Sequence, residues 1–368
     1  MVDKIAVLIP CYNEGKTIKK VVLDCKKAIA DIPNSTVYVY DNNSTDNTAE
    51  LAKEAGAVVR HEYMQGKGNV IRRMFREIDA ECYIMIDGDD TYPAEEIPKM
   101  ADYVLNQKYD MVVGDRLSSS YFEENKRPFH GIGNKLVRGS INFFFKNDIR
   151  DIMTGYRAFS TEFVKTYPVL SHGFEIETEM SIFAIVNNMA MVNHVIEYRD
   201  RPAGSESKLN TFSDGFKVLR LIFTLYRNYK PFKFYGFLSL ILFIIAALVF
   251  VPHVWIPYSA TGRVANMPTL IVCGFCVIAG IISFYSGLIL DSIQRQDRRE
   301  FEFRLQEVHH FFKQSNKQWF NCKMVVIYNC ILQLHWGRKW WNQKNILKWQ
   351  IVKFKLNILV DRKTHKGL

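Results

Sequence analysis

The sequence lacks both glycine-rich signatures that commonly accompany nucleotide binding. No G-x-G-x-x-G follows the first apolar stretch, and no P-loop occurs anywhere in the 368 residues. A standard dinucleotide site and a P-loop site are therefore not expected. Internal repeats and low-complexity tracts are absent as well, so a repeat architecture is not expected.

Features of secreted, disulfide-stabilised proteins are also missing. The seven cysteines are odd in number and lie mostly within apolar stretches, as reduced and buried thiols do. Cys273 and Cys276 have the spacing of a redox motif, but both lie inside a long apolar run, and packing is the interpretation we favour. We expect no signal peptide, because the apolar run after Lys4 is only IAVLIP and no small-residue cleavage site follows it.

Positive charge is concentrated at one end of the chain. The formal net charge is +10, and the residues from His309 onward hold twelve Lys and Arg against one acidic residue, Asp361. The rest of the chain is therefore close to neutral. A uniformly basic protein would suggest a nucleic acid partner, whereas an excess in one tail does not, and we expect no nucleic acid partner.

Residues 292–368 form a predicted cytoplasmic tail that is basic and rich in tryptophan. Tryptophan interleaved with lysine is compatible with binding to an anionic membrane surface. A dispensable extension is the alternative. Five of the six tryptophans lie in this tail, at Trp319, Trp336, Trp340, Trp341 and Trp349.

Two long runs without any charged residue predict membrane spans. They cover residues 234–251 and 269–290, within a segment 232–291, and each is long enough to cross a hydrocarbon core as a helix. Buried helices of a soluble domain are the alternative. Helices that are apolar on every face are unusual in a domain of this size, so two spans are the favoured interpretation.

Basic residues flank the two predicted spans on one side only. The loop between the spans holds a single basic residue, Arg263. Because positive charge marks the cytoplasmic side of a membrane protein, we expect an integral membrane protein with both termini in the cytoplasm. The flanking residues are Lys217, Arg220, Arg227, Lys230, Lys233, Arg295, Arg298, Arg299 and Arg304.

Residues 214–230 predict an amphipathic helix. Basic residues flank an apolar stripe, which is typical of a helix that lies in the membrane surface. A helix packed on the soluble domain is the alternative. The stripe has helical spacing and consists of Phe216, Leu219, Ile222, Phe223 and Tyr226.

Residues 1–213 alternate strand-like and helix-like segments. Strands are predicted near 4–10, 37–40, 57–59, 82–86 and 110–114, with helical patterns between most of them. Such alternation argues for an α/β domain with a mostly parallel sheet and helices on both faces. In such sheets, ligands bind beyond the carboxyl ends of the strands.

Polar residues follow four of these predicted strands and would line a single crevice. Asp87 and Asp89 form a D-x-D pair, which can share Mg²⁺ or Mn²⁺ with a diphosphate, because such ions take carboxylate and phosphate oxygens. A lone D-x-D usually marks a solvated turn, but its position among three further polar clusters favours a site. The clusters are PCYNE at 10–14, DNN at 41–43, DGDD at 87–90 and GDR at 114–116.

These motifs, in this order and spacing, resemble those of glycosyltransferase family 2. The motifs are PCYNE, DNNSTDNT, GKG, IDGDD and VVGDR, followed by DIMTGYRAFS, FEIETEMS and YRDRPAGSESKLN. The later motifs and the two apolar runs are similar to the polyprenyl-phosphate sugar transferases of that family. The resemblance implies a Rossmann-like GT-A catalytic domain followed by a two-helix transmembrane hairpin. It also implies inverting, metal-dependent transfer of a hexose from a nucleotide-diphosphate sugar to a polyprenyl phosphate, with UDP-hexose favoured and GDP-mannose left open.

The resemblance further implies roles for individual residues. Those expected to hold the nucleotide sugar are Pro10, Tyr12, Glu14, Asp41, Asp87, Gly88, Asp89, Arg201 and Lys208. Those expected to face the acceptor phosphate are Arg116, Arg127 and Lys135. Those expected to carry the transfer are Asp87, Asp89, Arg116, Arg201 and Lys208, with Asp151 and Glu177 near the donor sugar.

Two positions depart from the family pattern. Thr91 stands where the dolichyl-phosphate mannosyltransferases have a Gln metal ligand, so the metal is expected at Asp89 and Thr91 with phosphate and water. The loop from Arg201 to Lys208 is one residue longer than the usual R-x-x-G-x-S-K. Asp90, by contrast, is expected to face solvent or the helix start near Ala94.

A lipid phosphate acceptor needs no catalytic base, because it is already anionic near neutral pH. Two other functions remain open. A glycosyltransferase acting on a diacylglycerol lipid or another hydroxyl would need a base, such as Asp90 or Asp151. A membrane-anchored nucleotide-sugar-binding protein would have no catalytic activity. A homo-oligomer is also left open.

Overall fold

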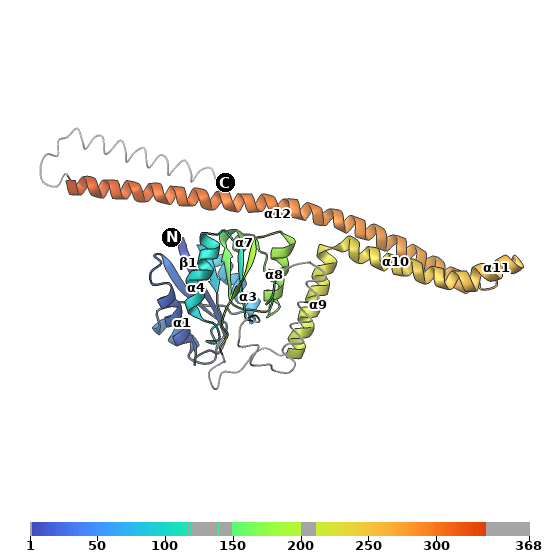
Figure 1. Cartoon of the computed structure of the whole chain (residues 1–368), viewed down its shortest axis with the longest axis horizontal. Coiled ribbons are helices and arrows are strands. Elements are labelled where there is room, and N and C mark those ends of the chain that lie inside the picture. The colour runs from blue at the N-terminus through green and yellow to red at the C-terminus, as the bar shows by residue number, and fades with distance from the viewer. Residues whose placement is uncertain (1, 117, 119–138, 140–148, 200–210, 336–368) are drawn as a thin grey trace. The chain divides into compact units, whose positions relative to one another are not determined.

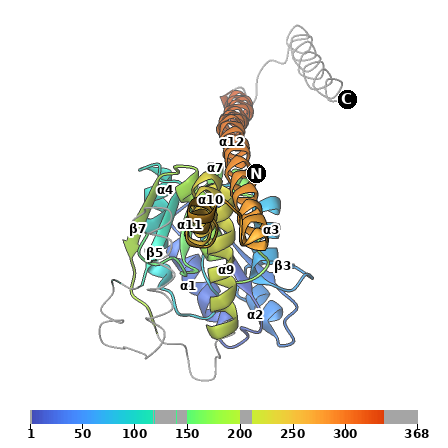
Figure 2. The same ribbon diagram turned by 90° about the vertical axis from the view of Figure 1, so that its right-hand side faces the viewer.

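The computed structural model describes residues 2–116, 118, 139, 149–199 and 211–335, with residues 211–219 and 313–335 described by their backbone alone. The strands in these residues are β1 (Asp3–Cys11), β2 (Ser35–Asp41), β3 (Val58–His61), β4 (Ala80–Met85), β5 (Met111–Asp115), β6 (Arg157–Ser160) and β7 (Met191–Val195). They form one sheet in the order β3-β2-β1-β4-β6-β5-β7. The edge strands β3 and β7 lie on opposite sides of the sheet (Figure 2).

Neighbouring strands run parallel everywhere except around β6. This strand pairs antiparallel with β4 on one side and with β5 on the other. The remaining pairs are parallel, which confirms the mostly parallel sheet predicted from the alternating pattern. The prediction did not include β6 or β7; β6 is an antiparallel strand that the alternation of strands and helices does not indicate.

Helices cover both faces of the sheet, and the alternation of side chains along β1 shows why. Ile5, Val7 and Ile9 pack into one core cluster with α1, α2 and α4. Ala6 and Leu8 point the other way and pack into a second cluster with α3, α7 and α8. Figure 1 shows α1 and α4 on one side of the strands and α7 and α8 on the other. A strand buried on both faces reads as a continuous apolar run, as KIAVLIP does. The helices are α1 (Ile18–Ala28), α2 (Thr48–Glu54), α3 (Lys67–Glu77), the 3₁₀ helix η1 (Ala94–Glu96), α4 (Ile97–Leu105), α7 (Thr161–Thr166) and α8 (Ile176–Val186).

The predicted spans lie in two long apolar helical stretches, Pro231–Thr261 and Met267–Phe312. In each, only 11% of the most apolar window is buried, whereas a core helix would be mostly buried, so a lipid environment fits better. The first stretch comprises α10 (Pro231–Phe250), the π-helix η2 (Val251–Trp255) and α11 (Ile256–Thr261). The second is part of α12 (Met267–His335).

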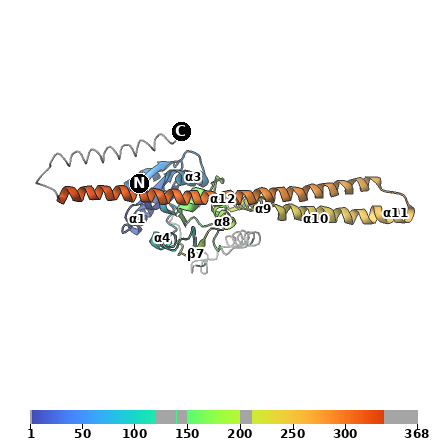
Figure 3. The same cartoon turned by 90° about the horizontal axis from the view of Figure 1, so that it is seen from above.

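Helix α10 and the first part of α12 form an antiparallel hairpin (Figure 3). The hydroxyl of Ser239 donates a hydrogen bond to the carbonyl of Gly280 at 2.8 Å. The rings of Phe232 and Phe284 meet edge to face with centroids 5.8 Å apart. Gly280 allows this close approach, since a Cβ there would lie 2.9 Å from the ring of Phe243.

Helix α9 (Thr211–Tyr229) contains most of the predicted amphipathic segment. Among its described side chains, Ile222 is 2% exposed and belongs to the core cluster that includes α8. Tyr226 packs against the same cluster. Phe223 is 54% exposed and contacts Phe234 edge to face. This part of the stripe therefore packs partly on the sheet domain, and a membrane-surface position of the helix stays a prediction.

Helix α12 continues far beyond the second predicted span and contacts the sheet domain. The ring of Phe301 packs edge to face against Phe183 of α8, with centroids 5.6 Å apart. Leu305 packs against the same core cluster. Residues 292–308, predicted as the start of the tail, thus belong to the same compact unit as the sheet, Met1–Val308, while His309–Leu368 form a second unit.

Candidate active site

The loops after β1 and β2 are joined by hydrogen bonds at the carboxyl edge of the sheet. The side-chain oxygen of Asn13 accepts from the backbone N–H of Thr45 at 2.7 Å. The hydroxyl oxygen of Ser44 accepts from the backbone N–H of Asn13 at 2.9 Å. Asn13 has φ 54°, a left-handed conformation that asparagine adopts more readily than most residues. The PCYNE and DNNSTDNT motifs therefore form one continuous surface.

Asp41, the last residue of β2, is 4% exposed, and only one of its two carboxylate oxygens has a hydrogen-bond partner. Its Oδ2 accepts from the backbone N–H of Ser44 at 3.2 Å and lies 3.4 Å from Nδ1 of His61. Its Oδ1 is buried and has no hydrogen-bond partner. A buried oxygen without a partner carries a desolvation cost, which an N–H donor from a ligand would remove.

The other residues predicted for the nucleotide lie at the same edge. Pro10 is paired in register with Tyr40 of β2. Tyr12 is 38% exposed, so it can present its ring to a ligand. The backbone N–H of Glu14 donates to the hydroxyl of Thr48 at 2.8 Å, which ties this loop to the first residue of α2.

The D-x-D segment follows β4 in a tightly packed turn. The carbonyl of Gly88 accepts from the hydroxyl of Thr17 at 2.7 Å, and a Cβ at Gly88 would lie 2.9 Å from Sγ of Cys11. Asp89 is 5% exposed. Its Oδ1 accepts from the hydroxyl of Thr91 at 2.6 Å and from the backbone N–H of the same residue at 3.3 Å. Thr91 therefore fixes the orientation of Asp89.

Asp90 does not face solvent or the helix start near Ala94, so that expectation is wrong. Its backbone has φ 59°, and its carboxylate lies 2.6 Å from Nζ of Lys20 on α1. The side chain of Asp90 is 12% exposed. The partner lies 70 positions away in the sequence, so local pattern did not reveal it.

Asp87 belongs to an ion-pair cluster with a lysine that was not predicted as a site residue. Nζ of Lys67, the first residue of α3, lies 2.7 Å from Oδ1 of Asp87 and 2.7 Å from Oε1 of Glu177. Burial alone would lower the pKa of Lys67, but the two carboxylates raise it above its ordinary value. Burial raises the pKa of Glu177, against the lowering effect of Lys67. The GKG motif was the available signal for Lys67.

Arg116, which follows β5, forms a bidentate ion pair with Asp151. The guanidinium Nε lies 2.7 Å from Oδ2, and Nη2 lies 3.1 Å from Oδ1. Asp151 is fully buried, and the rings of Tyr92 and Tyr198 lie 5.9 and 5.4 Å from the guanidinium carbon. Burial would lower the pKa of Arg116, but the charge of Asp151 raises it well above its ordinary value. The sequence placed both residues in the site but did not reveal that they pair.

Four predicted site residues lie outside the described residues: Arg127, Lys135, Arg201 and Lys208. The chain that leads toward Arg201 is described as far as Arg199, whose backbone N–H donates to the carbonyl of Thr91 at 3.0 Å. Arg199, two residues before the loop that begins at Arg201, is therefore attached to the turn that follows β4.

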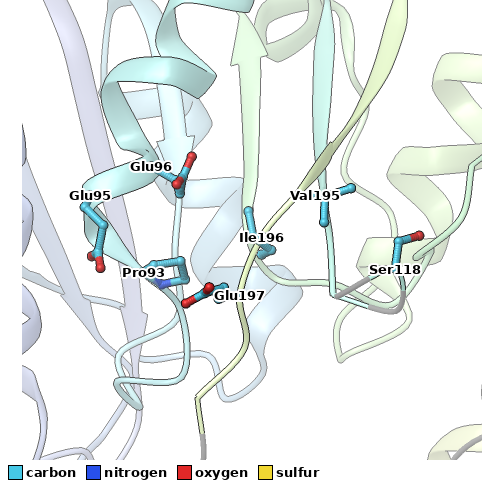
Figure 4. Close-up of a pocket in the computed structure, with 7 residues that line it drawn as sticks. All are labelled: Pro93, Glu95, Glu96, Ser118, Val195, Ile196 and Glu197. Atoms are coloured by element: carbon cyan, nitrogen blue, oxygen red, sulfur yellow. The ribbon is translucent and has the colours of Figure 1, made fainter. Parts of the chain in front are cut away.

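A cavity of about 380 Å³ lies beside the ends of β5 and β7 and contains none of the predicted site residues (Figure 4). Glu96 in its wall lies 2.8 Å from Nε2 of His194, and Glu95 pairs with Arg199. Two of the three glutamates in the wall therefore already have partners, and we assign the cavity no ligand. Its lining residues are Pro93, Glu95, Glu96, Ser118, Val195, Ile196 and Glu197.

Comparison with known proteins identifies the family. Residues 6–167 match the family model of glycosyl transferase family 2. Over 304 residues the chain is 32% identical to glycosyltransferase AglJ of Haloferax volcanii, an overlap that covers 82% of this chain and 98% of the relative. The chain belongs to glycosyltransferase family 2. The expected GT-A fold and glycosyltransferase activity are thereby confirmed.

Two further similarities concern individual members of the family. A dolichyl-phosphate hexose transferase of Haloferax volcanii is 30% identical to this glycosyltransferase over 222 residues, which cover 59% of this chain and 91% of the relative. The crystal structure of glucosyl-3-phosphoglycerate synthase from Mycobacterium tuberculosis with Mn²⁺, UDP and phosphoglyceric acid has a TM-score of 0.48 at 19% identity. That overlap covers 62% of this chain and 78% of the synthase, and it is too distant to inform on substrates.

Proposed function

We propose that this glycosyltransferase transfers a hexose from a nucleotide-diphosphate sugar to a polyprenyl phosphate, with inversion at the anomeric carbon. The order of its motifs, its apolar hairpin and its similarity to a dolichyl-phosphate hexose transferase support the proposal. The acceptor keeps its polyprenyl chain in lipid and its phosphate at the surface. A catalytic domain joined to two membrane helices meets that phosphate without extracting the lipid.

We favour a phosphate acceptor because two carboxylates of the site, Asp90 and Asp151, each form an ion pair with a basic residue. A hydroxyl acceptor needs a general base, and Asp90 and Asp151 are the candidates for that role. Asp90 is paired with Lys20, and Asp151 is paired with Arg116. Each of these carboxylates already contacts a cation, which leaves it less available to approach a hydroxyl and take its proton. A lipid phosphate has a second pKa of about 6 and is already anionic, so it needs a cation to bind it and no base.

Asp41 supports a uridine donor over a guanosine donor. Its Oδ2 already accepts from Ser44 and lies beside His61, while its Oδ1 has no partner. The uracil edge offers one imino N–H between two carbonyls, which matches one available acceptor oxygen. Guanine offers two adjacent donors, N1–H and the 2-amino group, which would need both oxygens. UDP-hexose is therefore the favoured donor, and GDP-mannose is the alternative.

We propose that Asp89 and Thr91 hold Mg²⁺ or Mn²⁺ together with the diphosphate of the donor. Carboxylate and hydroxyl oxygens fit the ligand preference of these hard cations. Among the described residues no group of three or more His, Cys, Asp or Glu forms a closed metal site, which is consistent with a cation that shares donor oxygens. When bound, the cation would supply positive charge for the leaving nucleoside diphosphate.

The remaining predicted residues take complementary roles in this proposal. Asp87 and Gly88 contact the ribose and diphosphate, while Tyr12 and Glu14 contact the nucleoside. Arg201 and Lys208 offset the charge of the leaving diphosphate. The predicted acceptor-phosphate residues are Arg116, Arg127 and Lys135.

The distribution of charge supports a cytoplasmic catalytic domain. Basic residues lie before α10 and after the apolar part of α12, whereas the connecting loop has only Arg263. Both termini would then be cytoplasmic.

A single cysteine introduced at Gly262 in the loop should react with an impermeant maleimide added from outside intact cells, in a chain whose other cysteines remain unreactive. Labelling only after the cells are opened would contradict this orientation.

A donor screen tests the proposed function. The purified full-length chain is incubated with polyprenyl phosphate, Mn²⁺ and radiolabelled UDP-glucose, UDP-galactose, UDP-N-acetylglucosamine or GDP-mannose. We expect acid-labile label in the lipid phase with one of the UDP sugars, and loss of transfer when the metal is chelated. Transfer with GDP-mannose alone would contradict the uridine assignment. Donor binding without transfer, or label only in added diacylglycerol, would contradict the proposed function.

A further inference from the structure

Lys67 lies between two carboxylates that come from distant parts of the sequence. One is Asp87 of the D-x-D segment, and the other is Glu177 in the first turn of α8, 110 positions from Lys67. The side chains of Lys67 and Glu177 are 10% and 7% exposed, while that of Asp87 is 25% exposed. Asp87 is thus the member of the cluster most accessible to a ligand.

We propose that Lys67 and Glu177 are positioning residues for Asp87 and thereby set the affinity of the enzyme for its donor nucleotide. The inference rests on the proposed function, in which Asp87 contacts the ribose and diphosphate. Glu177 orients the ammonium of Lys67, and this ammonium fixes the carboxylate of Asp87. Neither positioning residue needs to touch the reacting atoms.

The backbone around Lys67 is fixed on both sides, so its side chain starts from a defined position. The backbone N–H of Gly66 donates to the side-chain oxygen of Asn42 at 2.7 Å. The backbone N–H of Gly68 donates to the carbonyl of His172 at 2.9 Å, just ahead of α8. Gly66 has φ 129°, and a Cβ at Gly68 would lie 2.0 Å from the carbonyl oxygen of Ser171. The two glycines of GKG therefore let α3 start in contact with both the residue after β2 and the segment before α8.

Asp87 is also packed against the backbone of Gly155. A Cβ at Gly155 would lie 2.2 Å from Oδ2 of Asp87, so the backbone of Gly155 packs directly against the carboxylate. The backbone N–H of Gly155 donates to the hydroxyl of Tyr92 at 3.1 Å. Lys67 and Gly155 together leave the side chain of Asp87 little rotational freedom. Because this side chain is already ordered, binding of a ligand costs less side-chain conformational entropy.

Glu177 is itself held in place through α8. The hydroxyl of Ser181 donates to the carbonyl of Glu177 at 2.9 Å, and Nη1 of Arg157 donates to that hydroxyl at 2.9 Å. Arg157 is fully buried, and burial lowers its pKa to about 10, so it remains charged at neutral pH. The buried positive charge also favours the ionised form of Glu177.

The charge of Lys67 is needed at this position for an electrostatic reason. Without it, Asp87 and Glu177 would be two like charges near each other in a site that must admit an anionic diphosphate. Repulsion between the two carboxylates would favour rotation of Asp87 away from Glu177 and from the position that meets the donor. The ammonium offsets one of the two charges and holds the carboxylate of Asp87 in place for hydrogen bonds from the ribose.

Three variants test the inference in the full-length enzyme with Mn²⁺ present. Glu177→Gln keeps the shape of the side chain and an acceptor oxygen but removes the charge that orients Lys67. Lys67→Met removes the ammonium, and Lys67→Arg restores a cation with different geometry. The matched control is Lys165→Met, because Lys165 is also partly buried but bonds the carbonyls of Phe75 and Ile78 and lies 2.7 Å from Asp79.

The readouts are the dissociation constant of UDP and the KM values of donor and acceptor. We expect Glu177→Gln to weaken UDP binding about tenfold and to raise the donor KM to the same extent, since a hydrogen bond to a charged group typically contributes this much. Acceptor KM should stay within about twofold. Lys67→Met should weaken UDP binding further, and Lys67→Arg should recover part of the loss. Lys165→Met should lower the melting temperature and leave UDP binding unchanged.

Two results would overturn the inference. One is wild-type UDP affinity in Glu177→Gln, which is the variant least prone to misfold. The other is an equal rise of donor and acceptor KM that follows the loss of thermal stability, as a merely structural role would produce. Failure of the wild-type enzyme to bind any nucleoside diphosphate would instead refute the proposed function, so the two failures are distinguishable.

Discussion

Arg116 and Asp151 are joined by two parallel hydrogen bonds, of 2.7 and 3.1 Å, at the carboxyl edge of β5. Asp151 is fully buried, and Arg116 is the cation paired with it. Removal of one member of a buried pair leaves the other charge unpaired, which costs roughly 3–5 kcal/mol. Asp151→Asn should therefore lower the free energy of unfolding by about this amount and shift the midpoint of thermal unfolding downward.

Arg116→Lys separates the role of charge from that of geometry. Lysine keeps the positive charge but cannot make the bidentate contact with Asp151 or place a planar guanidinium beside the rings of Tyr92 and Tyr198. We expect kcat/KM for polyprenyl phosphate to fall at least about tenfold, while UDP affinity changes by less than about twofold. Unchanged acceptor kinetics would remove Arg116 from the acceptor site.

The adjacent carboxylates of Asp89 and Asp90 should differ sharply in function. Asp89 is oriented by Thr91 as the proposed metal ligand, whereas Asp90 pairs with Lys20. Asp89→Asn should reduce transfer by at least about a hundredfold, on the order of the loss when one preorganised electrostatic contact is removed. Asp90→Asn is the matched control, because asparagine accepts the φ of 59° found there, and it should retain most activity.

Initial rates across a Mn²⁺ titration check this contrast. Thr91→Val and Thr91→Ser extend the comparison, since only serine keeps the hydroxyl beside Asp89. Valine should raise the Mn²⁺ concentration required for half-maximal rate, and serine should not. Equal activity in Asp89→Asn and the wild type would disprove the metal assignment.

The lowered pKa of Glu77 predicts that the free energy of unfolding depends on pH. Burial would raise its pKa, but hydrogen bonds from Arg60, Arg73 and Tyr40 lower it more, to about 2 from an ordinary 4.5. A folded-state pKa below the unfolded one stabilises the protein above pH 4.5, and this contribution is lost as the pH falls from 4.5 toward 2.

The variant Glu77→Gln removes this contribution. The wild type should unfold at a higher temperature than the variant at pH 7, and the difference should shrink steadily between pH 4.5 and 3. Thermal unfolding of both proteins in the same detergent measures it. A difference that stays constant down to pH 3 would contradict the assigned contacts, because the wild-type carboxylate would then not be titrating as the structure requires.

The contact between Phe301 and Phe183 predicts that the membrane helix α12 stabilises the catalytic domain. An edge-to-face aromatic pair contributes about 0.5–1.5 kcal/mol beyond the area it buries. Phe301→Ala should therefore lower the thermal midpoint of the catalytic domain by a few degrees. Phe303, which is 66% exposed, is the control, and Phe303→Ala should leave the midpoint unchanged. Equal effects of the two variants would indicate that α12 does not bind at Phe183.

Much of the fold and part of the site could be predicted from local pattern. The continuous apolar run of β1 indicated a strand buried on both faces, and the polar residues after β1, β2, β4 and β5 indicated a shared edge. Backbone hydrogen bonds and side-chain alternation act over a few residues, so local sequence records them. The D-x-D pair was visible for the same reason.

The contacts that organise the site could not be predicted in this way. Lys67 meets Glu177 across 110 positions, and Lys20 meets Asp90 across 70. Such pairs depend on how α1, α3 and α8 pack on the sheet, which no periodicity specifies. β6 was not predicted because it is inserted antiparallel between β4 and β5, which breaks the alternation of strands and helices. The packing of Phe301 on α8 likewise depends on the path of α12 after the membrane.

The choice of acceptor is the central claim, and a direct competition tests it. The enzyme is reconstituted with its preferred donor and with polyprenyl phosphate and diacylglycerol at equal concentration in one membrane, and the two products are quantified by mass spectrometry. Because both candidate bases, Asp90 and Asp151, are engaged in ion pairs, transfer to the hydroxyl should be at least about a hundredfold slower, in line with the usual contribution of general-base catalysis. Hexosylated diacylglycerol in equal or greater amount would contradict the account.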